Sequence, residues 1–369
     1  MAHIGIDARL LAYRTGGIST YTRRLISALN DLTPPHEITI GISRKQSAPL
    51  PVSFASTALW TPPHHRWERL ALSVELARYR FDIWHSPDFI PPYRGARRHV
   101  ITVHDLTFWH YPQYLTPEGR AYYNDQIKNA VQQADHILVV SEATRRDLMD
   151  ILDVPTDKMT IQPHGAGDQY RPFSPQELVQ AQNALNLPQG YILHVGTLEP
   201  RKNIIGLLEG YRLLLDRMSD VPPVVLVGKP GWLFQETQQK IDALNLGDRL
   251  MWRQNIDDAL LPAVYNLAKV LVTPSFYEGF GMPALEAMAC GIVPIVSNRS
   301  SLPEVVGEMG LLIDPDDPST ITTALQKALT DETWYQAQRT AALERARGYT
   351  WAHSAQIALD VYAQVLDKK

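Results

Sequence analysis

The fold is decided by the stretch Val270-Leu-Val-Thr-Pro-Ser-Phe-Tyr-Glu-Gly-Phe-Gly-Met-Pro-Ala-Leu-Glu286. Its apolar start predicts a strand at 270–272 and its glycines predict a turn. Pro283 suits the first turn of a helix, where the missing N–H of proline is not needed. A strand that passes through such a turn into a helix presents backbone N–H groups and the positive helix end at the carboxyl edge of a parallel sheet. The stretch therefore predicts an anion site in an α/β fold.

Two glutamates, Glu278 and Glu286, flank this anion site and narrow down its ligand. A bare phosphate is disfavoured between two acids, whereas a sugar joined to a nucleotide offers hydroxyls that donate hydrogen bonds to ionised carboxylates. We expect Glu278 to hold the sugar and Glu286 the ribose. The alternative is a glycine-rich turn with two solvated glutamates. The phosphate is expected on the turn and the helix start, which consist of Gly279, Phe280, Gly281, Met282 and Pro283.

Outward from this stretch, short apolar runs alternate with helical patterns along nearly the whole chain. This alternation predicts βαβ units and parallel sheets. Strands are expected at 3–6, 38–42, 83–85, 100–103, 136–140, 191–195, 224–227, 250–252, 270–272, 292–296 and 310–313. Helices are expected at 18–32, 66–79, 117–133, 142–151, 203–216, 235–244, 258–267, 283–289, 302–306, 320–347 and 351–366.

The length of 369 residues favours two domains. The proline-containing range 162–188 is the predicted linker. It leaves an N-terminal domain over 1–170 and a C-terminal domain over 185–345, both predicted to be α/β, doubly wound and Rossmann-like. The last helix, about 351–369, has no strand to lead into and is expected to pack outside the second domain or back on the first.

Composition excludes several classes of protein. The net charge of −4 argues against nucleic-acid binding, and no apolar run approaches the ~20 residues of a membrane-spanning helix. The first residues look like a strand rather than a signal peptide, and the single cysteine, Cys290, excludes an internal disulfide, so a cytoplasmic location is expected. Ten of the 12 histidines lie within 1–170, so the first domain is expected to gain positive charge as the pH falls toward about 6.5.

Three further groups of residues are predicted to be functional. Arg201 and Lys202 follow the strand expected at 191–195, where fixed cations would stabilise a pyrophosphate leaving group; the alternative is an exposed basic helix start. Gly16 and Gly17 join the first strand to the first helix and allow a ligand close to the backbone. His104 ends a strand at the sheet edge where such folds bind ligands, although an isolated histidine there is more often packed or capped.

Taken together, these motifs resemble glycosyltransferase family 4. The segment 277–291, with its Glu278-x7-Glu286 pattern, is similar to the signature of the family, and the resemblance extends to His194-Val-Gly-Thr-Leu-Glu-Pro-Arg-Lys-Asn203, to 140–148 and to 298–307. It runs along essentially the whole chain. Many members carry arginine directly after the strand glycine, where this chain has Thr197. The guanidinium for the donor must then come from Arg201 or from elsewhere.

The resemblance implies a GT-B fold, in which two Rossmann-like domains face each other across a cleft, and a retaining enzyme of the bacterial mannosyl- and glucosyltransferase group. By position, Arg201 and Lys202 would grip the donor diphosphate, Glu278 would position the sugar, and His104 would contact the sugar near the reacting bond. The donor would be a nucleotide diphosphate hexose bound by the C-terminal domain, with a slight preference for UDP over GDP. The acceptor would be a glycan or a lipid-linked glycan bound by the N-terminal domain, in the synthesis of a cell-surface polysaccharide.

The nucleotide sugar is expected to act as a co-substrate without a further cofactor or a metal. The pattern Asp314-x-Asp316, which holds a divalent metal in another glycosyltransferase fold, is flanked by prolines and is predicted to be a turn, with Ser319 and Thr320 as helix caps. Basic and aromatic residues at 66–69 and 93–99 leave peripheral association with the inner face of a membrane open. The alternatives to a transferase are an epimerase or hydrolase on the same fold, and a two-domain sugar-nucleotide-binding protein without catalysis.

Overall fold

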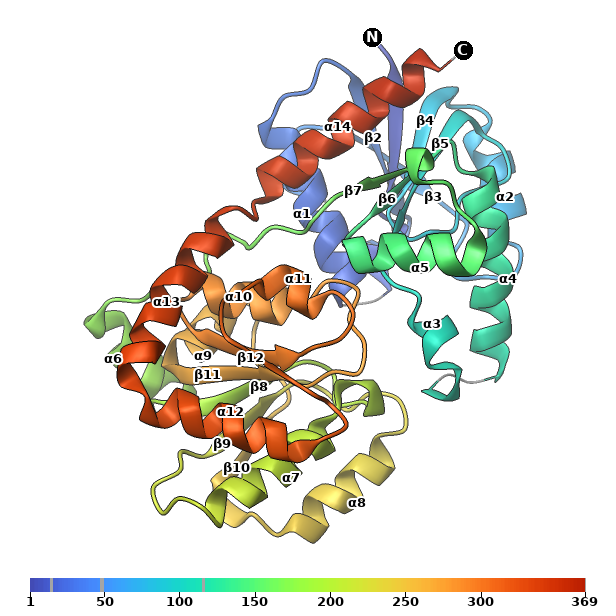
Figure 1. Ribbon diagram of the computed structural model, residues 1–369. Coiled ribbons are helices and arrows are strands. Elements are labelled where there is room, and N and C mark those ends of the chain that lie inside the picture. Colours follow the sequence, from blue (N-terminus) through green and yellow to red (C-terminus); the bar gives the residue numbers. More distant parts are fainter. Residues whose placement is uncertain (14–15, 47–49, 115–116, 369) are drawn as a thin grey trace. The chain divides into compact units, whose positions relative to one another are not determined.

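The structure is a computed structural model and describes residues 1–13, 16–46, 50–114 and 117–368. The chain forms two compact units, which are treated one at a time (Figure 1). The first unit comprises residues 1–165, apart from 113–115, together with Thr350–Lys369. The second unit comprises Ala166–Tyr349 together with Gln113–Leu115.

A parallel sheet forms the centre of the first unit. Within the described residues it has seven strands in the order β3-β2-β1-β4-β5-β6-β7. Its central strands are apolar on both faces, as expected for parallel strands that helices cover on both sides. The strands are β1 (His3–Asp7), β2 (Glu37–Ser43), β3 (Ala55–Leu59), β4 (Phe81–Ser86), β5 (Ala96–Val103), β6 (His136–Val139) and β7 (Met159–Ile161).

Helices cover both faces of this sheet. In Figure 1, α1 and α14 lie side by side on one face, while α2 and α4 lie on the other. In the part of the chain that the structure describes, no helix has the length and apolarity needed to cross a membrane. The α-helices are α1 (Gly17–Asp31), α2 (Glu68–Leu76), α3 (Thr107–His110), α4 (Pro117–Gln133), α5 (Glu142–Leu152) and α14 (Trp351–Asp367), and the 3-10 helices are η1 (Arg9–Ala12), η2 (Pro112–Tyr114) and η3 (Thr156–Lys158).

The C-terminal helix α14 is part of the first unit, although more than 180 residues of the second unit precede it. Buried polar contacts hold it against the sheet. Tyr362 Oη lies 2.7 Å from His85 Nδ1 on β4, and Gln162 Nε2 donates to the carbonyl of Ser354 at 2.8 Å. A buried hydrogen bond is costly to leave unmade, so these contacts fix where α14 packs.

The second unit repeats the same plan. Among its described residues, six parallel strands follow the order β10-β9-β8-β11-β12-β13. Helices α7 and α12 pack on one face, and α10 and α13 on the other (Figure 1). The strands are β8 (Tyr191–Val195), β9 (Val224–Val227), β10 (Leu250–Arg253), β11 (Ala268–Thr273), β12 (Val293–Ser297) and β13 (Leu311–Ile313). The helices are α6 (Pro175–Leu185), α7 (Ile204–Leu215), α8 (Phe234–Leu244), α9 (Leu261–Leu267), α10 (Met282–Ala289), α11 (Leu302–Val306), α12 (Pro318–Thr330), α13 (Glu332–Arg347), η4 (Pro200–Lys202) and η5 (Gly247–Arg249).

The predicted α/β class and the two doubly wound parallel sheets are confirmed, and the boundary between the two units, after Gly165, lies within the predicted linker 162–188. Two details are wrong. The later part of that range forms helix α6, whose start is fixed by a capping box between Ser174 and Glu177. The helix predicted over 320–347 is two helices, because Asp331 ends α12 and its side chain accepts from Trp334 N at 3.0 Å to start α13. The sequence analysis also missed the edge strands β3 and β7.

Five histidines of the first unit do not become protonated near pH 6.5, contrary to the expectation from the sequence. Burial lowers the pKa of His85 to about 3 and the pKa values of His99 and His136 to about 4. Burial also lowers the pKa values of His104 and His164. The expectation that this unit gains positive charge as the pH approaches 6.5 is therefore wrong for these five, because their rings stay neutral to lower pH.

Candidate active site

The predicted donor residues meet where the strand order of the second unit reverses. In this sheet β8 and β11 are neighbours, and the chain leaves them in opposite directions. Doubly wound sheets bind ligands at such a switch point, outside the carboxyl ends of the two strands. Arg201 and Lys202 follow β8, and Glu278 follows β11.

Glu278 is the centre of a buried ion-pair cluster. Lys202 Nζ donates to Glu278 Oε1 at 2.6 Å, and Arg201 Nη1 donates to Oε2 at 3.1 Å. Ser275 Oγ also donates to Oε1, at 2.6 Å. Arg201 further contacts the carboxylate of Glu199 at 2.8 Å. The side chains of Glu278, Lys202 and Arg201 are only 9%, 12% and 15% exposed, so these charges depend on one another rather than on water.

The backbone around Glu278 is fixed by the loops beside it. Ser301 Oγ donates to the carbonyl of Glu278 at 2.8 Å, and Glu278 N donates to Ser300 Oγ at the same distance. Phe276 N donates to the carbonyl of Arg201 at 2.9 Å. Contacts on both sides of the turn thus hold the carboxylate in one position, as a precise binding site requires.

The charges of the cluster determine what Glu278 can bind. Burial alone raises the pKa of Glu278, but Lys202 and Arg201 outweigh burial and lower this pKa to about 2. The carboxylate is therefore ionised at neutral pH, and an ionised carboxylate accepts hydrogen bonds without donating any. The cluster offers one acceptor for hydroxyls beside two cations for phosphate, which suits a ligand that carries both groups.

The start of α10 has the geometry of an anion site. Gly281 precedes the helix with φ 101°, and a Cβ there would lie 2.7 Å from Leu302 Cδ2, so glycine is required. The helix begins at Met282, one residue before its predicted start, and Pro283 lies in its first turn, as predicted. The first N–H groups of a helix have no partner inside it. Phe280 is buried and packs edge-on against Tyr349, with ring centroids 5.9 Å apart.

Glu286 lies on α10 and is also buried. Its Oε2 accepts a hydrogen bond from Tyr265 Oη at 2.7 Å. Glu278 and Glu286 are 7% and 8% exposed, so the alternative of two solvated glutamates is wrong. Burying a carboxylate is costly unless a partner compensates it. Both carboxylates have such partners: Lys202 and Arg201 for Glu278, and Tyr265 for Glu286.

His104 directly follows β5 in the first unit. Its Nε2 lies 2.8 Å from the carbonyl of Pro87, and since a carbonyl only accepts, Nε2 carries a proton. The ring packs edge-on against Tyr21 at 4.8 Å. Burial lowers the pKa of His104 against the opposing effect of the Pro87 carbonyl, so the ring is neutral at neutral pH. A neutral ring suits contact with a sugar better than contact with a phosphate.

The two glycines before the first helix also lie in the first unit. Gly16 caps α1 with φ 150°, and Gly17 is its first residue. A Cβ added at either position would meet no atom within 4 Å, so the surrounding protein does not require glycine by crowding. Residues 14 and 15, which precede them, lie outside the described residues.

Several partners of the predicted residues were missed by the sequence analysis. They are Glu199, Tyr265, Ser275, Ser300 and Ser301, which contact Arg201, Glu278 or Glu286. Ser275 precedes Glu278 by three residues and Glu199 precedes Arg201 by two, so these two had a local signal. Tyr265, Ser300 and Ser301 come from a separate helix or loop, and only the fold brings them to Glu278 or Glu286.

The Asp314-x-Asp316 segment forms the predicted turn. Asp317 N donates to the carbonyl of Asp314 at 3.1 Å, and both Asp314 and Asp316 pair with Arg299. The helix that follows begins at Pro318 with Asp317 as its cap, so the prediction that Ser319 and Thr320 are the caps is wrong. Across the described ranges, no group of three or more His, Cys, Asp or Glu residues is arranged to hold a metal ion.

Comparison with known proteins agrees with this geometry. Residues 15–168 match the model of "Glycosyltransferase Family 4", and residues 175–347 match that of "Glycosyl transferases group 1". The chain is 34% identical over 288 residues to O-antigen chain mannosyltransferase B of Escherichia coli, which covers 78% of this chain and 75% of that protein. It is 31% identical to the serotype-specific mannosyltransferase WbdA of Escherichia coli, over 72% of this chain but only 33% of that longer protein.

Solved structures resemble the whole chain. Sucrose-phosphate synthase of Thermosynechococcus elongatus aligns with a TM-score of 0.78 over 99% of both chains, at 22% identity. HepE of Anabaena in complex with UDP-glucose aligns with a TM-score of 0.79 over 99% of this chain and 100% of that chain, at 14% identity. At sequence identities this low, the likeness shows a shared fold and nothing about the reaction or the substrates.

Proposed function

The chain belongs to glycosyltransferase family 4 and is a glycosyltransferase, and from this premise we propose that it transfers a hexose from a nucleotide diphosphate sugar to a glycan or lipid-linked glycan. The second unit binds the donor and the first unit binds the acceptor. The observation that carries this proposal is the cluster in which Glu278 faces both Lys202 and Arg201 at the β8/β11 switch point.

Each part of the donor has a complementary group in this site. Arg201 and Lys202 are cations that stabilise a diphosphate, and they matter most when the glycosidic bond breaks and charge develops on the leaving group. Glu278 accepts hydrogen bonds from the sugar hydroxyls, and Glu286 accepts them from the ribose. The backbone N–H groups at the start of α10 add a second anion contact. His104 contributes to catalysis from the first unit.

Mannose is the hexose that the relatives favour, since two of them are named as mannosyltransferases. Their names also support a role in the synthesis of a cell-surface polysaccharide. The choice between uracil and guanine depends on contacts that belong to the base alone. A competition between UDP and GDP decides it directly.

We further propose retention of the anomeric configuration without a metal ion. Retention by double displacement requires a carboxylate at the reacting carbon, and Glu278 is already engaged by two cations and Ser275. Attack on the same face that the diphosphate leaves, with a phosphate oxygen taking the proton of the acceptor hydroxyl, needs no such nucleophile. Arg201 and Lys202 then supply the positive charge that a metal provides in other transferases.

Thermal-shift titration with UDP, GDP, UDP-glucose and GDP-mannose, each with and without EDTA, tests donor binding. A ligand at 100 times its dissociation constant stabilises the folded state by about 2.7 kcal/mol. We expect one nucleotide to raise the midpoint, EDTA to leave the shift unchanged, and Glu286→Ala to abolish it. Loss of the shift in EDTA would contradict the metal-free proposal, and no shift with any nucleotide would contradict the donor proposal.

Analysis of the products separates a transferase from the alternatives. We expect NMR to detect a new glycosidic bond with the anomeric configuration of the donor when a methyl glycoside is added as acceptor. Release of unbound sugar alone would support a hydrolase, and a changed sugar still attached to the nucleotide would support an epimerase. An inverted product would exclude the proposed same-face attack.

Peripheral membrane association is proposed for the surface around α2, because apolar side chains are exposed there. Trp67, Leu70 and Val74 recur at helical spacing on the outer side of this helix and are 54%, 53% and 74% exposed. Trp60 is 67% exposed and lies next to the same helix, because its backbone N–H donates to Oε1 of Glu75 on α2 at 2.6 Å. Exposed aromatic and aliphatic side chains that adjoin one another are typical of interaction surfaces.

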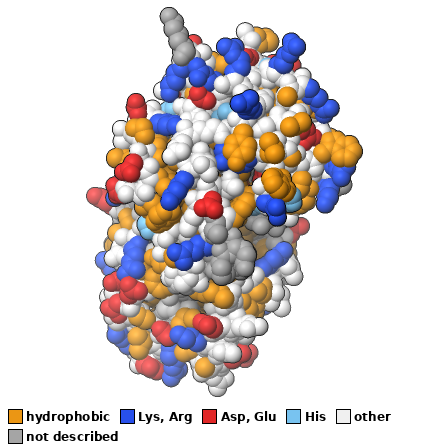
Figure 2. Space-filling view, turned by 90° about the vertical axis from the view of Figure 1, so that its right-hand side faces the viewer, with side chains coloured by type: hydrophobic (Ala, Val, Ile, Leu, Met, Phe, Trp, Pro, Cys, Tyr) orange, Lys and Arg blue, Asp and Glu red, His pale blue; other side chains and the backbone are white. Residues whose placement is uncertain are grey.

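Arginines accompany these apolar side chains. Arg44 lies 4.0 Å above the ring of Trp60, and Arg66 lies 4.9 Å from the ring of Trp67. In Figure 2, apolar and basic side chains are interspersed over the upper part of the molecule, which belongs to the first unit. Basic and apolar groups together fit the headgroup region of an anionic bilayer, where each basic residue contributes about 1 kcal/mol.

Sedimentation with vesicles tests this surface. We expect the protein to pellet with vesicles of phosphatidylglycerol and phosphatidylcholine, less so at high salt, and not with phosphatidylcholine alone. The double variant Trp67→Ala, Val74→Ser should stay in solution, whereas Val179→Ser, at an exposed valine of the second unit, should pellet like the wild type. Equal pelleting of both variants would exclude α2 as the contact.

A further inference from the structure

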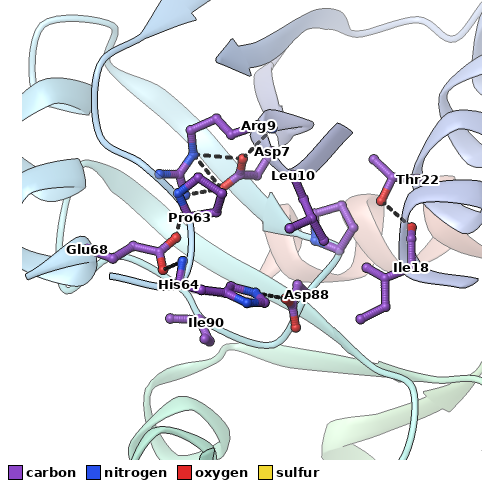
Figure 3. A pocket seen from close by; sticks show the side chains of 11 residues that line it. Asp7, Arg9, Leu10, Ile18, Thr22, Pro63, His64, Glu68, Asp88 and Ile90 are labelled. Atoms are coloured by element: carbon purple, nitrogen blue, oxygen red, sulfur yellow. Dashed lines mark hydrogen bonds and ion pairs between the residues drawn. The ribbon is translucent and has the colours of Figure 1, made fainter. Parts of the chain in front are cut away.

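A pocket lies at the switch point of the first unit, and none of its residues is among the catalytic or donor-binding residues predicted from the sequence. The strand order of this sheet reverses between β1 and β4, which are neighbours. Asp7 ends β1, and Pro87 and Asp88 follow β4 directly. By the rule for doubly wound sheets, this position is a ligand site. The lining residues are Asp7, Arg9, Leu10, Ile18, Thr22, Pro63, His64, Glu68, Pro87, Asp88 and Ile90 (Figure 3).

One side of the pocket is a rigid ion-pair base. The guanidinium of Arg9 is 1% exposed and contacts Asp7 Oδ2 at 2.6 Å and Glu68 Oε1 at 2.7 Å. Its Nη1 donates to the carbonyl of Thr61 at 2.8 Å. Figure 3 shows this group beside Pro63 and Leu10. Because Arg9 is buried and already neutralises two carboxylates, it stabilises the wall of the pocket and is not available to bind an incoming anion.

The other side of the pocket carries Asp88. His64 Nε2 forms a hydrogen bond with Asp88 Oδ2, and His64 N donates to Glu68 Oε2 at 2.6 Å, so His64 joins the two sides (Figure 3). Burial raises the pKa of Asp88, but the hydrogen bond from His64 outweighs it and lowers the pKa. The Asp88 carboxylate is 16% exposed, so it is held in place and still reaches the solvent side.

The pocket adjoins the predicted catalytic residue His104. The carbonyl of Pro87, next to Asp88 in the chain, accepts the hydrogen bond from His104 Nε2 at 2.8 Å. His104 and Asp88 are also close enough to affect each other's pKa. A group held on Asp88 therefore lies within the surroundings of His104 and not at a remote part of the unit.

The chemistry of the lining selects the ligand. Three carboxylates, on Asp7, Glu68 and Asp88, face one permanent cation, so a phosphate would be repelled. The cavity volume is ≈ 20 Å³, which is room for about one water-sized group. Leu10, Ile18 and Ile90 add apolar walls. One hydroxyl of a neutral sugar, which donates to a carboxylate and carries no charge, fits this combination, while the rest of the sugar stays outside the cavity.

We propose that this pocket is a subsite for the acceptor sugar, in which Asp88, positioned by His64, accepts a hydrogen bond from one acceptor hydroxyl. The inference rests on the proposed transferase function and adds to it the residues of the first unit that hold one acceptor hydroxyl, Asp88 and its partner His64. Asp88 orients the acceptor, while the proton of the attacking hydroxyl goes to the departing phosphate as proposed above.

Direct binding of methyl α-D-mannopyranoside and methyl α-D-glucopyranoside, measured by ligand-observed NMR with and without UDP or GDP, tests the subsite. We expect the wild type to bind at least one of these glycosides and to bind mannose 1-phosphate more weakly. Asp88→Asn should weaken binding roughly 10- to 100-fold, because a hydrogen bond to a charged acceptor is lost. Ile18→Phe should block the pocket and also weaken binding without changing any charge.

The chain offers a matched control. Asp147 and His110 form another Asp–His pair in the first unit, at 3.1 Å and outside the pocket, so Asp147→Asn removes the same charge elsewhere. It should bind the glycosides like the wild type. The proposal is overturned if the wild type binds neither glycoside, if Asp88→Asn and Ile18→Phe both bind like the wild type, or if Asp147→Asn is equally impaired. If Asp88→Asn fails to fold, Ile18→Phe decides.

The failure of this inference and the failure of the proposed function give different results. A protein whose melting midpoint rises with a nucleotide, but whose glycoside binding ignores Asp88, keeps the donor proposal and loses the subsite. A protein that binds glycosides through Asp88, but no nucleotide, keeps the subsite and loses the donor proposal. We expect Asp88→Asn to retain the full nucleotide-dependent thermal shift, since the residues proposed for the donor lie in the second unit.

Discussion

Lys202 Nζ lies 2.6 Å from Glu278 Oε1, although 76 positions separate the two residues in the chain. The parallel arrangement of β8 and β11 brings them together, because each residue follows the carboxyl end of one of these neighbouring strands. The pair is buried, and Arg201 adds a second cation to the same carboxylate. In such a cluster, loss of one member leaves an uncompensated charge, so binding and stability are coupled.

The first prediction concerns the charge of Glu278. Glu278→Gln leaves Lys202 and Arg201 without their shared anion, so we expect the free energy of unfolding to fall by about 3–5 kcal/mol, the usual effect of breaking a buried pair. Urea denaturation at pH 7.5 measures it. A nucleotide diphosphate should recover part of the loss, because its phosphates replace the missing anion. Glu344→Gln, at the exposed Arg347 pair, should leave the unfolding midpoint unchanged.

The outcome separates two roles of Glu278. If Glu278→Gln is destabilised and nucleotide binding recovers stability while transfer is lost, Glu278 holds the sugar. If stability, binding and transfer all stay at wild-type levels, the cluster has neither the structural nor the catalytic importance assigned to it.

The fold and the core of the proposed donor site could be predicted from the sequence because both depend on local patterns. The stretch around Glu278 and Glu286 contains its own strand, turn and helix start, and the alternation of apolar runs predicts parallel sheets. Strand β3 was missed because most of its residues are exposed, so it lacks the continuous apolar run of a central strand. Strand β7 has only three residues, too few for a periodic pattern.

The pocket at Asp88 could not be predicted, for a different physical reason. Asp7, His64 and Asp88 belong to separate segments, and each occurs in a setting where an acid or a histidine is ordinary. Only the strand order, with β4 placed beside β1, brings them together. Two of them follow predicted strands closely, which was the available signal, but the sequence does not say which strands are neighbours.

The second prediction concerns the hydroxyl of Tyr265. Tyr265→Phe removes the donor from the buried carboxylate of Glu286, so we expect a loss of about 1–3 kcal/mol in unfolding free energy and weaker nucleotide binding. Tyr191→Phe is the matched control, since its hydroxyl is equally buried but donates to the carbonyl of Val264 at 2.6 Å. Isothermal titration with UDP and GDP measures affinity. Equal affinities in the two variants would exclude a role for the Tyr265–Glu286 contact in the donor site.

The third prediction tests why residue 17 is glycine. An alanine Cβ at this position would meet no protein atom within 4 Å, and residue 17 begins a helix, so Gly17→Ala should stabilise the protein by about 0.4–1 kcal/mol. If a substrate approaches the backbone there, the same change should lower kcat/KM at least tenfold. Denaturation and a transfer assay on one preparation measure both. A variant that is more stable and fully active would show that Gly17 has no contact with substrate.

The last prediction concerns the pH dependence of the first unit. Burial lowers the pKa of His85 to about 3 and the pKa of His136 to about 4, below the unfolded value of about 6.5. The unfolded state therefore binds protons first, so the stabilisation is complete above pH about 6.5 and is lost as the pH falls toward 4. Each such histidine makes the free energy of unfolding fall by at most about 1.4 kcal/mol for each pH unit of acidification, and all five histidines with lowered pKa values act in this direction. Glu68, whose pKa burial raises, and His110, whose pKa the hydrogen bond with Asp147 raises, oppose them.

Hydrogen exchange resolved by peptide, at pH 7.5 and pH 5 and corrected for the intrinsic rate, measures this difference. We expect protection to fall at pH 5 in β5 and β6 of the first unit and much less in β12 of the second unit. Among the described residues of the second unit, His194 on β8 is the one histidine whose pKa is lowered. His136→Gln should reduce the pH dependence of urea denaturation by up to one proton, because this ring is buried against Thr160. His353→Gln, at an exposed position on α14, should leave it unchanged. Equal loss of protection in both units would contradict the assignment to these rings.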